Sequence, residues 1–280
     1  MLPETLGVIG LGALGGSVAW RAARAGVPRI LGNAVSTRDG AAAVRVGAVT
    51  EFVHHPEVVM RSSDFVVLAT PPTATLRLLR QFGPMLVERG VCCTDVTSVK
   101  RPIVRAAERL GLAAVFAGSH PLVDIDAHGF AAARPDSLAD AIVYITPLAD
   151  GERAAAEAAD FWTRGIHAHP VTLTAEQHDA LVAWTSHLPH LAAAALAGTL
   201  GDGGPAGVTF VRGLLEATRL ATLDSVVWSE LLLANRDNVL CVLEGLTGSL
   251  DGLRSALDAG DGAAVHAWLE RGVAWRRKYE

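Results

Sequence analysis

The sequence has few of the residues that build metal or disulfide sites, and it has no excess of positive charge. Its 280 residues include only three cysteines, Cys92, Cys93 and Cys241, and the formal net charge is −5. No metal-site spacing joins these cysteines, so no metal is expected. Nucleic acid is an unexpected partner for a chain without a basic patch. Sparse, odd-numbered cysteines are typical of a reducing compartment.

Long hydrophobic runs are absent as well. Apolar stretches such as 191–200 are too short and too rich in alanine to cross a membrane. The N-terminus leads directly into an apolar strand, without the pattern of a signal or transit peptide. These features predict a cytoplasmic protein with no membrane contact.

Two kinds of pattern divide the chain. In the first half, short apolar runs typical of buried strands alternate with helical spacing, which predicts a parallel sheet covered by helices on both faces. After Pro170 the long segments read as helices. The expected fold is an α/β Rossmann-type dinucleotide-binding domain over residues 1–171, followed by an all-α helical dimerisation domain over residues 172–280. Strands are expected at 6–9, 29–31, 65–69, 91–94, 113–116 and 142–145, and helices at 15–25, 73–87, 101–110, 176–199, 208–222, 226–246, 249–259 and 262–278.

The expected helices of the second half are apolar on several faces. A surface helix normally keeps one polar face, and a domain of this size has too little interior to bury all of these side chains. Burial against a second subunit resolves the conflict, which predicts a homodimer. A tight monomeric bundle is the alternative.

A glycine-rich turn follows the first expected strand and opens the first helix. This is the arrangement that confirms a Gly-x-Gly-x-x-Gly motif as a dinucleotide site. Gly10 makes the tight turn, Gly12 lets the backbone approach a pyrophosphate, and Gly15 allows close packing of helix on strand. The predicted cofactor-binding residues here are Gly10, Leu11, Gly12, Ala13, Leu14 and Gly15, with Thr70 after a later strand.

The end of the second strand bears on the choice between NAD and NADP. An acidic residue that would hold the ribose 2′-hydroxyl of NAD is expected near Ala34, but the first carboxylate is Asp39. Ser36, Thr37 and Arg38 lie nearby, and an arginine can hold a 2′-phosphate with two hydrogen bonds. NADP is therefore slightly favoured over NAD; a solvated loop arginine is the alternative for Arg38.

Several segments together resemble the prephenate/arogenate dehydrogenases of tyrosine biosynthesis, over almost the whole chain. The resemblance is most specific at Ser186-His187-Leu188-Pro189-His190. It implies NAD(P)-dependent oxidative decarboxylation of a cyclohexadienol: hydride leaves the carbon that bears the hydroxyl, a base takes the hydroxyl proton, and loss of carbon dioxide makes the ring aromatic. The other matching segments are 10–17, 95–100, 118–122, 129–133 and 178–179.

His120 is the candidate base, because an unperturbed imidazole is neutral near pH 7 and because this residue follows an expected strand at the ligand-binding edge. A histidine that caps the turn before Pro121 is the alternative. Ser98 is the second candidate catalytic residue. It is expected to share with His120 the hydrogen bond to the reacting hydroxyl. Its alternative is an N-cap for the helix that begins near Lys100.

The substrate-binding residues are carried over from the resemblance. Arg219 matches the arginine that binds a carboxylate, with Arg212 as a competitor and a surface ion pair as the alternative. His190 is expected to face the substrate and His187 to lie on the same helix face, unless it packs at the domain junction. Asp126 keeps an acidic position of the family.

One residue departs from the family pattern: Asp124 stands where a glycine is usual, at the edge of the substrate pocket. An additional carboxylate there repels a dicarboxylate or attracts a substrate amine. The sequence therefore leaves three functions open: a prephenate or arogenate dehydrogenase, a family member that acts on an amino-substituted prephenate in a secondary pathway, and a non-catalytic nucleotide-binding regulator.

Overall fold

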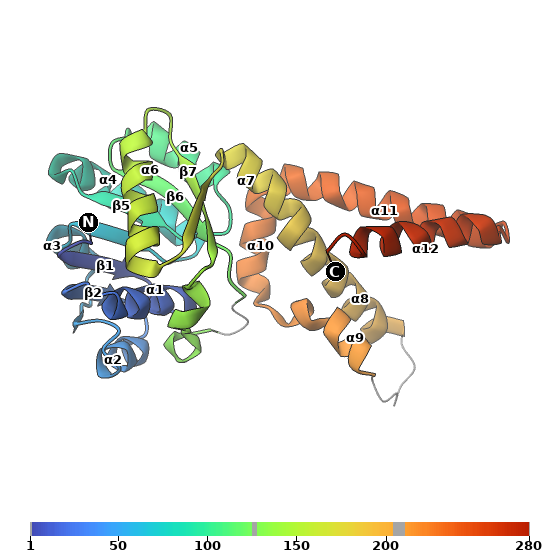
Figure 1. Cartoon of the computed structure of the whole chain (residues 1–280), viewed down its shortest axis with the longest axis horizontal. Coiled ribbons are helices and arrows are strands. Elements are labelled where there is room, and N and C mark those ends of the chain that lie inside the picture. The colour runs from blue at the N-terminus through green and yellow to red at the C-terminus, as the bar shows by residue number, and fades with distance from the viewer. Residues whose placement is uncertain (1, 125–127, 204–210, 280) are drawn as a thin grey trace.

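The computed structural model describes residues 2–124, 128–203 and 211–279, and it shows an α/β body joined to a helical part (Figure 1). The body contains an eight-stranded sheet in the order β3-β2-β1-β4-β5-β6-β7-β8. All neighbouring strands are parallel except β6 and β7, which are antiparallel. The strands are β1 (Thr5–Ile9), β2 (Arg29–Asn33), β3 (Glu51–Phe52), β4 (Phe65–Leu68), β5 (Cys92–Asp95), β6 (Phe116–Pro121), β7 (Ile142–Pro147) and β8 (His169–Thr172).

Helices cover both faces of the sheet, each over its own apolar cluster. The first cluster lies beneath α1 (Ala13–Arg24), α2 (Thr37–Arg45) and α6 (Glu152–Asp160). The second lies beneath α3 (Pro56–Ser62), α4 (Pro72–Arg89) and α5 (Arg101–Arg109). Strand order reverses between β1 and β4, and ligands of open α/β sheets bind at the carboxyl ends of the strands at such a point.

The helical part begins with one long continuous helix. It comprises α7 (Ala175–Val182), a π-helical turn η4 (Ala183–His187) and α8 (Leu188–Gly203). Further along lie α9 (Arg212–Ala217), a 3-10 turn η5 (Arg219–Thr222) and α10 (Ser225–Ala234). The last two helices, α11 (Arg236–Asp258) and α12 (Gly262–Arg276), lie side by side and project away from the sheet (Figure 1).

The helix over Ala175–Gly203 is long and apolar enough to cross a membrane by length and composition, and 28% of its most apolar window is buried. The same helix carries buried polar residues, among them His178, Asp179 and His187. Such residues pack against the α/β body, which gives this helix a role in a folded core.

Several expected elements differ from the structure. The strand expected over 113–116 is wrong, because β6 begins only at Phe116 and continues through Gly118, Ser119 and His120. These small and polar residues read as a loop in the sequence. They form a strand because Ser119 is buried and its hydroxyl lies 2.5 Å from the Thr94 hydroxyl and 2.9 Å from the Trp162 indole nitrogen.

The expected helix over 226–246 is also interrupted, since Asn235 separates α10 from α11. Asn235 is fully buried, and its amide donates to the carbonyl of Asp179 at 2.7 Å. A tertiary hydrogen bond therefore sets the break. The elements β3, β8, α2, α3 and α6 were not expected from the sequence, and the antiparallel pairing of β6 with β7 departs from an all-parallel sheet.

A buried ion pair closes the carboxyl end of β5. Lys100 and Asp95 are both fully buried, and the Lys100 ammonium lies 2.5 Å from the Asp95 carboxylate and 2.5 Å from the carbonyl oxygen of Ser119. The other Asp95 oxygen accepts from the Ser119 backbone N–H at 3.2 Å. The pair thus fixes the backbone immediately before His120.

We expect Lys100→Met to lower the free energy of unfolding by about 3–5 kcal/mol, because Asp95 would stay buried without its cation. Urea denaturation followed by tryptophan fluorescence measures this loss. The double variant Asp95→Asn/Lys100→Met should lose less, since no unpaired charge remains.

The matched control is Arg61→Met, which removes an exposed ion pair with Glu57 at 2.9 Å. Such a pair contributes about 0–1 kcal/mol. Equal losses for Lys100→Met and Arg61→Met would contradict a stabilising role for the buried pair.

Candidate active site

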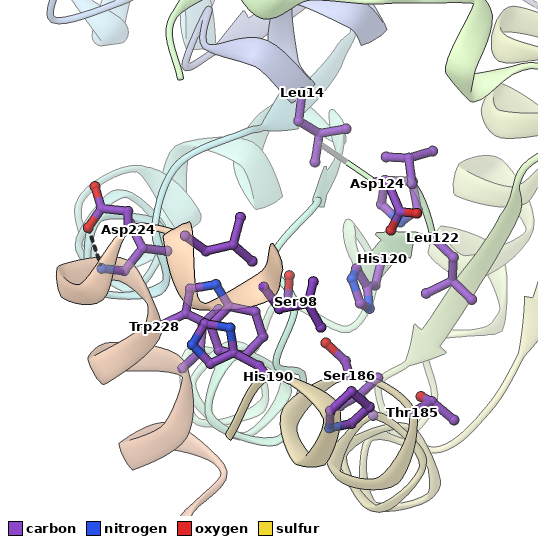
Figure 2. A pocket seen from close by; sticks show the side chains of 18 of the residues that line it. Leu14, Ser98, His120, Leu122, Asp124, Thr185, Ser186, His190, Asp224 and Trp228 are labelled. Carbon is purple, nitrogen blue, oxygen red and sulfur yellow. Dashed lines mark hydrogen bonds between the residues drawn. The ribbon is translucent and has the colours of Figure 1, made fainter. Parts of the chain in front are cut away.

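A cavity of about 610 Å³ lies between the carboxyl end of the sheet and the helical part (Figure 2). Residues from both parts line it. The α/β body contributes Leu14 from α1, Ser98, and His120 with the segment that follows it. The helical part contributes residues from α7, η4, α8, η5 and α10. Its lining includes Leu14, Ser98, His120, Leu122, Asp124, His128, Ser186, His190, Arg219, Asp224 and Trp228.

Behind this cavity, three side chains form a hydrogen-bonded chain. His120 Nδ1 lies 2.8 Å from His178 Nε2, and His178 Nδ1 lies 2.8 Å from the Asp179 carboxylate. His178 and Asp179 are fully buried, whereas His120 is half-buried and lines the cavity. The first member comes from β6 and the other two from α7, so the chain crosses the boundary between the two parts.

The hydrogen-bond network assigns the proton on each ring. An ionised carboxylate only accepts, so His178 Nδ1 carries the proton and donates it to Asp179. In a neutral imidazole the other nitrogen is then an acceptor, so His178 Nε2 accepts from His120 Nδ1–H. His120 Nε2 is therefore the nitrogen without a proton. This is the tautomer that a general base needs.

The pKa values agree with neutral imidazoles. Burial lowers the pKa of His120 well below its ordinary value of 6.5, and the neighbouring His178 and Lys100 lower it further. Burial also lowers the pKa of His178, although its hydrogen bond to Asp179 opposes the shift. For Asp179, burial raises the pKa, but the hydrogen bonds from His178 and from two backbone N–H groups outweigh it, so the net shift is downward.

Those two backbone N–H groups belong to the N-cap and the first residue of α5. Lys100 N–H and Arg101 N–H donate to the two Asp179 oxygens at 2.7 and 2.9 Å. A carboxylate at a helix N-terminus satisfies unpaired donors and meets the positive end of the helix dipole. Asp179 thus caps a helix of the other part. The side chain of Ser98 does not cap α5, so the alternative that Ser98 is the N-cap of this helix is wrong.

Ser98 is half-buried on the cavity wall, and its hydroxyl makes no hydrogen bond within the described part of the chain. On the opposite wall, His190 stacks on Trp228 with ring centroids 3.7 Å apart and an interplanar angle of 3°. Arg219 also lines the cavity, from η5. Arg212 does not; it is exposed on α9, 2.7 Å from Glu216.

Two further residues, His187 and Asp126, were predicted to bind the substrate. His187 is buried behind the wall and does not line the cavity; its Nδ1 lies 3.3 Å from the Asn235 amide. Burial lowers the pKa of His187 to about 4. Packing at the domain junction describes its place better than substrate contact. Asp126 lies outside the described residues.

The glycine turn has the geometry that a dinucleotide requires. Gly10 has a φ of +103°, and a Cβ there would lie 2.1 Å from the Ala69 carbonyl oxygen. A Cβ on Gly15 would lie 1.9 Å from the Gly10 oxygen, whereas one on Gly12 would meet nothing within 4 Å. The open space at Gly12 borders the N-terminus of α1, which has no side-chain cap and no acidic residue in its first turn. Phosphate groups bind well at such a position.

The predicted 2′-phosphate residues lie at the start of α2. Thr37 and Arg38 are exposed, while the Ser36 hydroxyl accepts from Asp39 N–H and caps the helix. The strand before them ends in Asn33, whose amide donates to the carbonyls of Val53 and His54 at 2.8 and 3.1 Å. No carboxylate therefore ends β2.

Thr70, the remaining predicted cofactor residue, lies in the turn between β4 and α4. Its hydroxyl lies 2.9 Å from the Thr75 hydroxyl, and the Thr75 hydroxyl donates to the Thr70 carbonyl at 3.1 Å. These bonds fix the turn that packs against Gly10. A Cβ on Gly10 would lie 3.2 Å from the methyl carbon of Thr70.

Sequence reasoning gave no site role to His178, Asp179 or Trp228. The signal for the first two was an imidazole beside a carboxylate at the start of the second domain. Their partners, His120 and the N-terminus of α5, are far away in the sequence, so only the folded chain shows the connection. Trp228 carries no sequence signal beyond its helix.

The dinucleotide turn, the two-part architecture and a neutral imidazole at the cavity define a nucleotide-dependent dehydrogenase. The family model "Prephenate dehydrogenase, nucleotide-binding domain" matches residues 21–172, and "Prephenate dehydrogenase, dimerization domain" matches residues 174–271. The chain belongs to the prephenate dehydrogenase family. It is therefore an oxidoreductase, which sets aside the non-catalytic regulator.

Individual relatives agree with this assignment. The chain is 27% identical to the prephenate dehydrogenase of Bacillus subtilis, over 98% of this chain and 76% of that protein. It is 30% identical to the cyclohexadienyl dehydrogenase of Zymomonas mobilis, over 92% of this chain and 89% of that one. The prephenate dehydrogenase of Aquifex aeolicus, solved with hydroxyphenyl propionate and NAD+, superposes with a TM-score of 0.87 at 25% identity, covering 99% and 98% of the two chains.

We expect His178→Phe to lower kcat by about 10²- to 10⁴-fold, because His120 loses the acceptor that holds its proton on Nδ1. His178→Gln should retain a larger share of activity, since its side-chain oxygen can accept the same hydrogen bond. Steady-state kinetics of both variants measure this difference.

Cofactor binding and circular dichroism serve as controls, and both should match the wild type. If His178→Phe and His178→Gln lose activity equally, or if the phenylalanine variant keeps near-normal turnover, the proposed orientation of His120 by His178 is wrong.

Proposed function

We propose that this enzyme oxidises prephenate, arogenate or both, with His120 as the base. The observation that carries the proposal is the chain from Asp179 through His178, which leaves His120 Nε2 unprotonated in a cavity that reaches the nucleotide-binding turn at Leu14. Ser98 and His120 then share the ring hydroxyl, since both line this cavity.

The bound dinucleotide supplies the hydride acceptor. As hydride leaves the ring carbon, His120 Nε2 takes the proton from the hydroxyl on that carbon. The bond from the ring to the carboxylate then breaks, its electron pair enters the ring, and carbon dioxide leaves. The ring oxygen regains a proton and becomes a phenol.

The cavity wall also supports binding of carboxylates. A planar guanidinium binds a carboxylate with two parallel hydrogen bonds, and Arg219 lines the cavity opposite the α/β body. We assign Arg219 to a substrate carboxylate and His190 to the substrate side of the same wall, where Trp228 holds its ring by stacking. Asp126, by its position in the sequence, keeps its assignment from the family pattern.

We further propose a homodimer that acts in the cytoplasm. The family model that matches residues 174–271 is that of a dimerization domain. In a single copy, apolar side chains of α11 and α12 such as Leu240, Leu257 and Trp275 are more than half exposed. A second subunit would bury them. The free cysteines of the structure suit a reducing compartment.

The activity assay crosses prephenate and arogenate with NAD and NADP and follows the absorbance of the reduced nicotinamide. We expect turnover with at least one pair, and His120→Asn should lower kcat by about 10²- to 10⁴-fold with little change in cofactor affinity. Near-normal turnover of His120→Asn would remove this residue as the base.

The pH profile gives a second test of the same base. A general base works only when deprotonated, and the pKa of His120 lies well below 6.5. Lowering the pKa moves the acidic limb of kcat to lower pH, so turnover should stay level as pH falls through 6.5 and decline only further down. A decline centred at or above 6.5 would contradict this environment for His120.

For the cofactor, we propose NADP as the better ligand, because Asn33 ends β2 without a carboxylate and Arg38 lies exposed on the next turn. Arg38→Ala should weaken NADP binding about tenfold and NAD binding by much less. Arg45→Ala, an exposed arginine at the other end of α2, is the matched control. Equal losses for NADP and NAD, or a strong native preference for NAD, would overturn the assignment.

A further inference from the structure

Two carboxylates line the cavity among the residues that the structure describes, and they differ in how they are satisfied. One Asp224 oxygen caps α10 by accepting from Val226 N–H and Val227 N–H at 2.8 and 3.2 Å, and the other lies 3.8 Å from His128 Nε2. Asp124 is exposed, and its carboxylate has no hydrogen bond and no ion pair with another residue within the described ranges. Figure 2 shows its side chain on the His120 side of the cavity. Asp124 is therefore the carboxylate left for a ligand.

A second, independent feature points to a missing donor. His190 lines the same cavity and is only 8% exposed, and its Nδ1 has no hydrogen-bond partner among the residues described. Burial lowers its pKa, although a hydrogen bond to the Leu220 backbone opposes the shift. A neutral ring that donates through its other nitrogen leaves Nδ1 as an acceptor. Buried polar atoms without partners are rare in folded proteins, and this one belongs to a ring on the cavity wall.

The charges of the two candidate substrates differ at one group. Prephenate carries two carboxylates, and its single O–H donor is the ring hydroxyl, which Ser98 and His120 require. Arogenate has the same ring but an ammonium on its side chain, which adds a positive charge and further donors. Like charges repel each other, so a carboxylate on the wall without a partner opposes prephenate with its two negative charges and favours arogenate with its ammonium.

From the unpaired carboxylate of Asp124, we infer that this enzyme selects a cyclohexadienyl amino acid, and that Asp124 binds the side-chain ammonium of arogenate. The inference rests on the proposed function and names its substrate. Asp124 acts in recognition only: hydride still leaves the ring carbon, His120 still takes the hydroxyl proton, and carbon dioxide still leaves from the ring.

The test compares kcat/KM for arogenate and for prephenate in the wild type and in Asp124→Asn, which keeps the shape of the side chain and removes its charge. The wild type should prefer arogenate. Asp124→Asn should lower kcat/KM for arogenate about tenfold to a hundredfold, as expected for loss of a hydrogen bond to a charged group, and mainly through KM. For prephenate, kcat/KM should stay level or rise.

Asp150→Asn is the matched control. Asp150 is exposed at a turn outside the cavity, and its φ of +57° is one that asparagine also adopts. It removes the same charge from the molecule and should leave both substrates unchanged. A similar loss in both variants would mean a general charge effect and would overturn the role of Asp124.

The outcomes separate this inference from the proposed function. If the wild type oxidises prephenate and Asp124→Asn leaves the ratio of the two substrates unchanged, the inference fails and the proposed function stands. If the wild type oxidises neither substrate, the proposed function fails. Calorimetry with NADP present then decides the inference: L-tyrosine carries the side-chain ammonium and 4-hydroxyphenylpyruvate does not, so Asp124→Asn should weaken L-tyrosine alone. Equal or absent effects on the two ligands would overturn it.

Discussion

The carboxylate of Asp179 is the interaction on which the rest of this structure depends. It is fully buried at the boundary between the α/β body and the helical part, and it accepts from Lys100 N–H, Arg101 N–H and His178 Nδ1–H. An unpaired carboxylate in that position would cost several kcal/mol. The two parts must therefore meet in a single orientation, because only the N-terminus of α5 supplies both backbone donors.

Contact between the two parts and the orientation of His120 thus depend on the same carboxylate. The oxygen that receives Lys100 N–H also receives the His178 proton, and His178 in turn accepts from His120. On the other side of the same backbone, the buried Lys100–Asp95 pair fixes Ser119 and so the position of β6. At the cavity, Ser98 and His190 Nδ1 have no hydrogen-bond partners among the described residues. Away from the cavity, Arg101 Nε and Thr146 Oγ1 are also buried without such a partner.

Much of this could be predicted from the sequence, because the signals are local. The Gly10–Gly15 turn after an apolar strand, the alternation of strands and helices and the change to helices after Pro170 each depend on neighbours in the chain. Position within the network could not be predicted in this way. Ser119 and His120 lie in a strand although their segment reads as a loop in the sequence, because Thr94 and Trp162 form hydrogen bonds with the Ser119 hydroxyl. His187 and His190 share a helix, yet His187 ends the π-helical turn and is buried behind the wall, and of the two only His190 lines the cavity.

The sequence by itself determined the two-domain architecture, the nucleotide-binding turn and the family, since periodicity and motif spacing are properties of the chain alone. It also supplied Asp124, a single charge whose presence is visible without coordinates. The tertiary structure decided which imidazoles line the cavity, on which nitrogen the proton of His120 lies, and which carboxylate of the described lining has no partner. Those properties depend on burial and on partners many residues away, such as His178 for His120 and Lys100 for Asp179. Hydrogen bonding and desolvation act through space, so the folded chain alone fixes them.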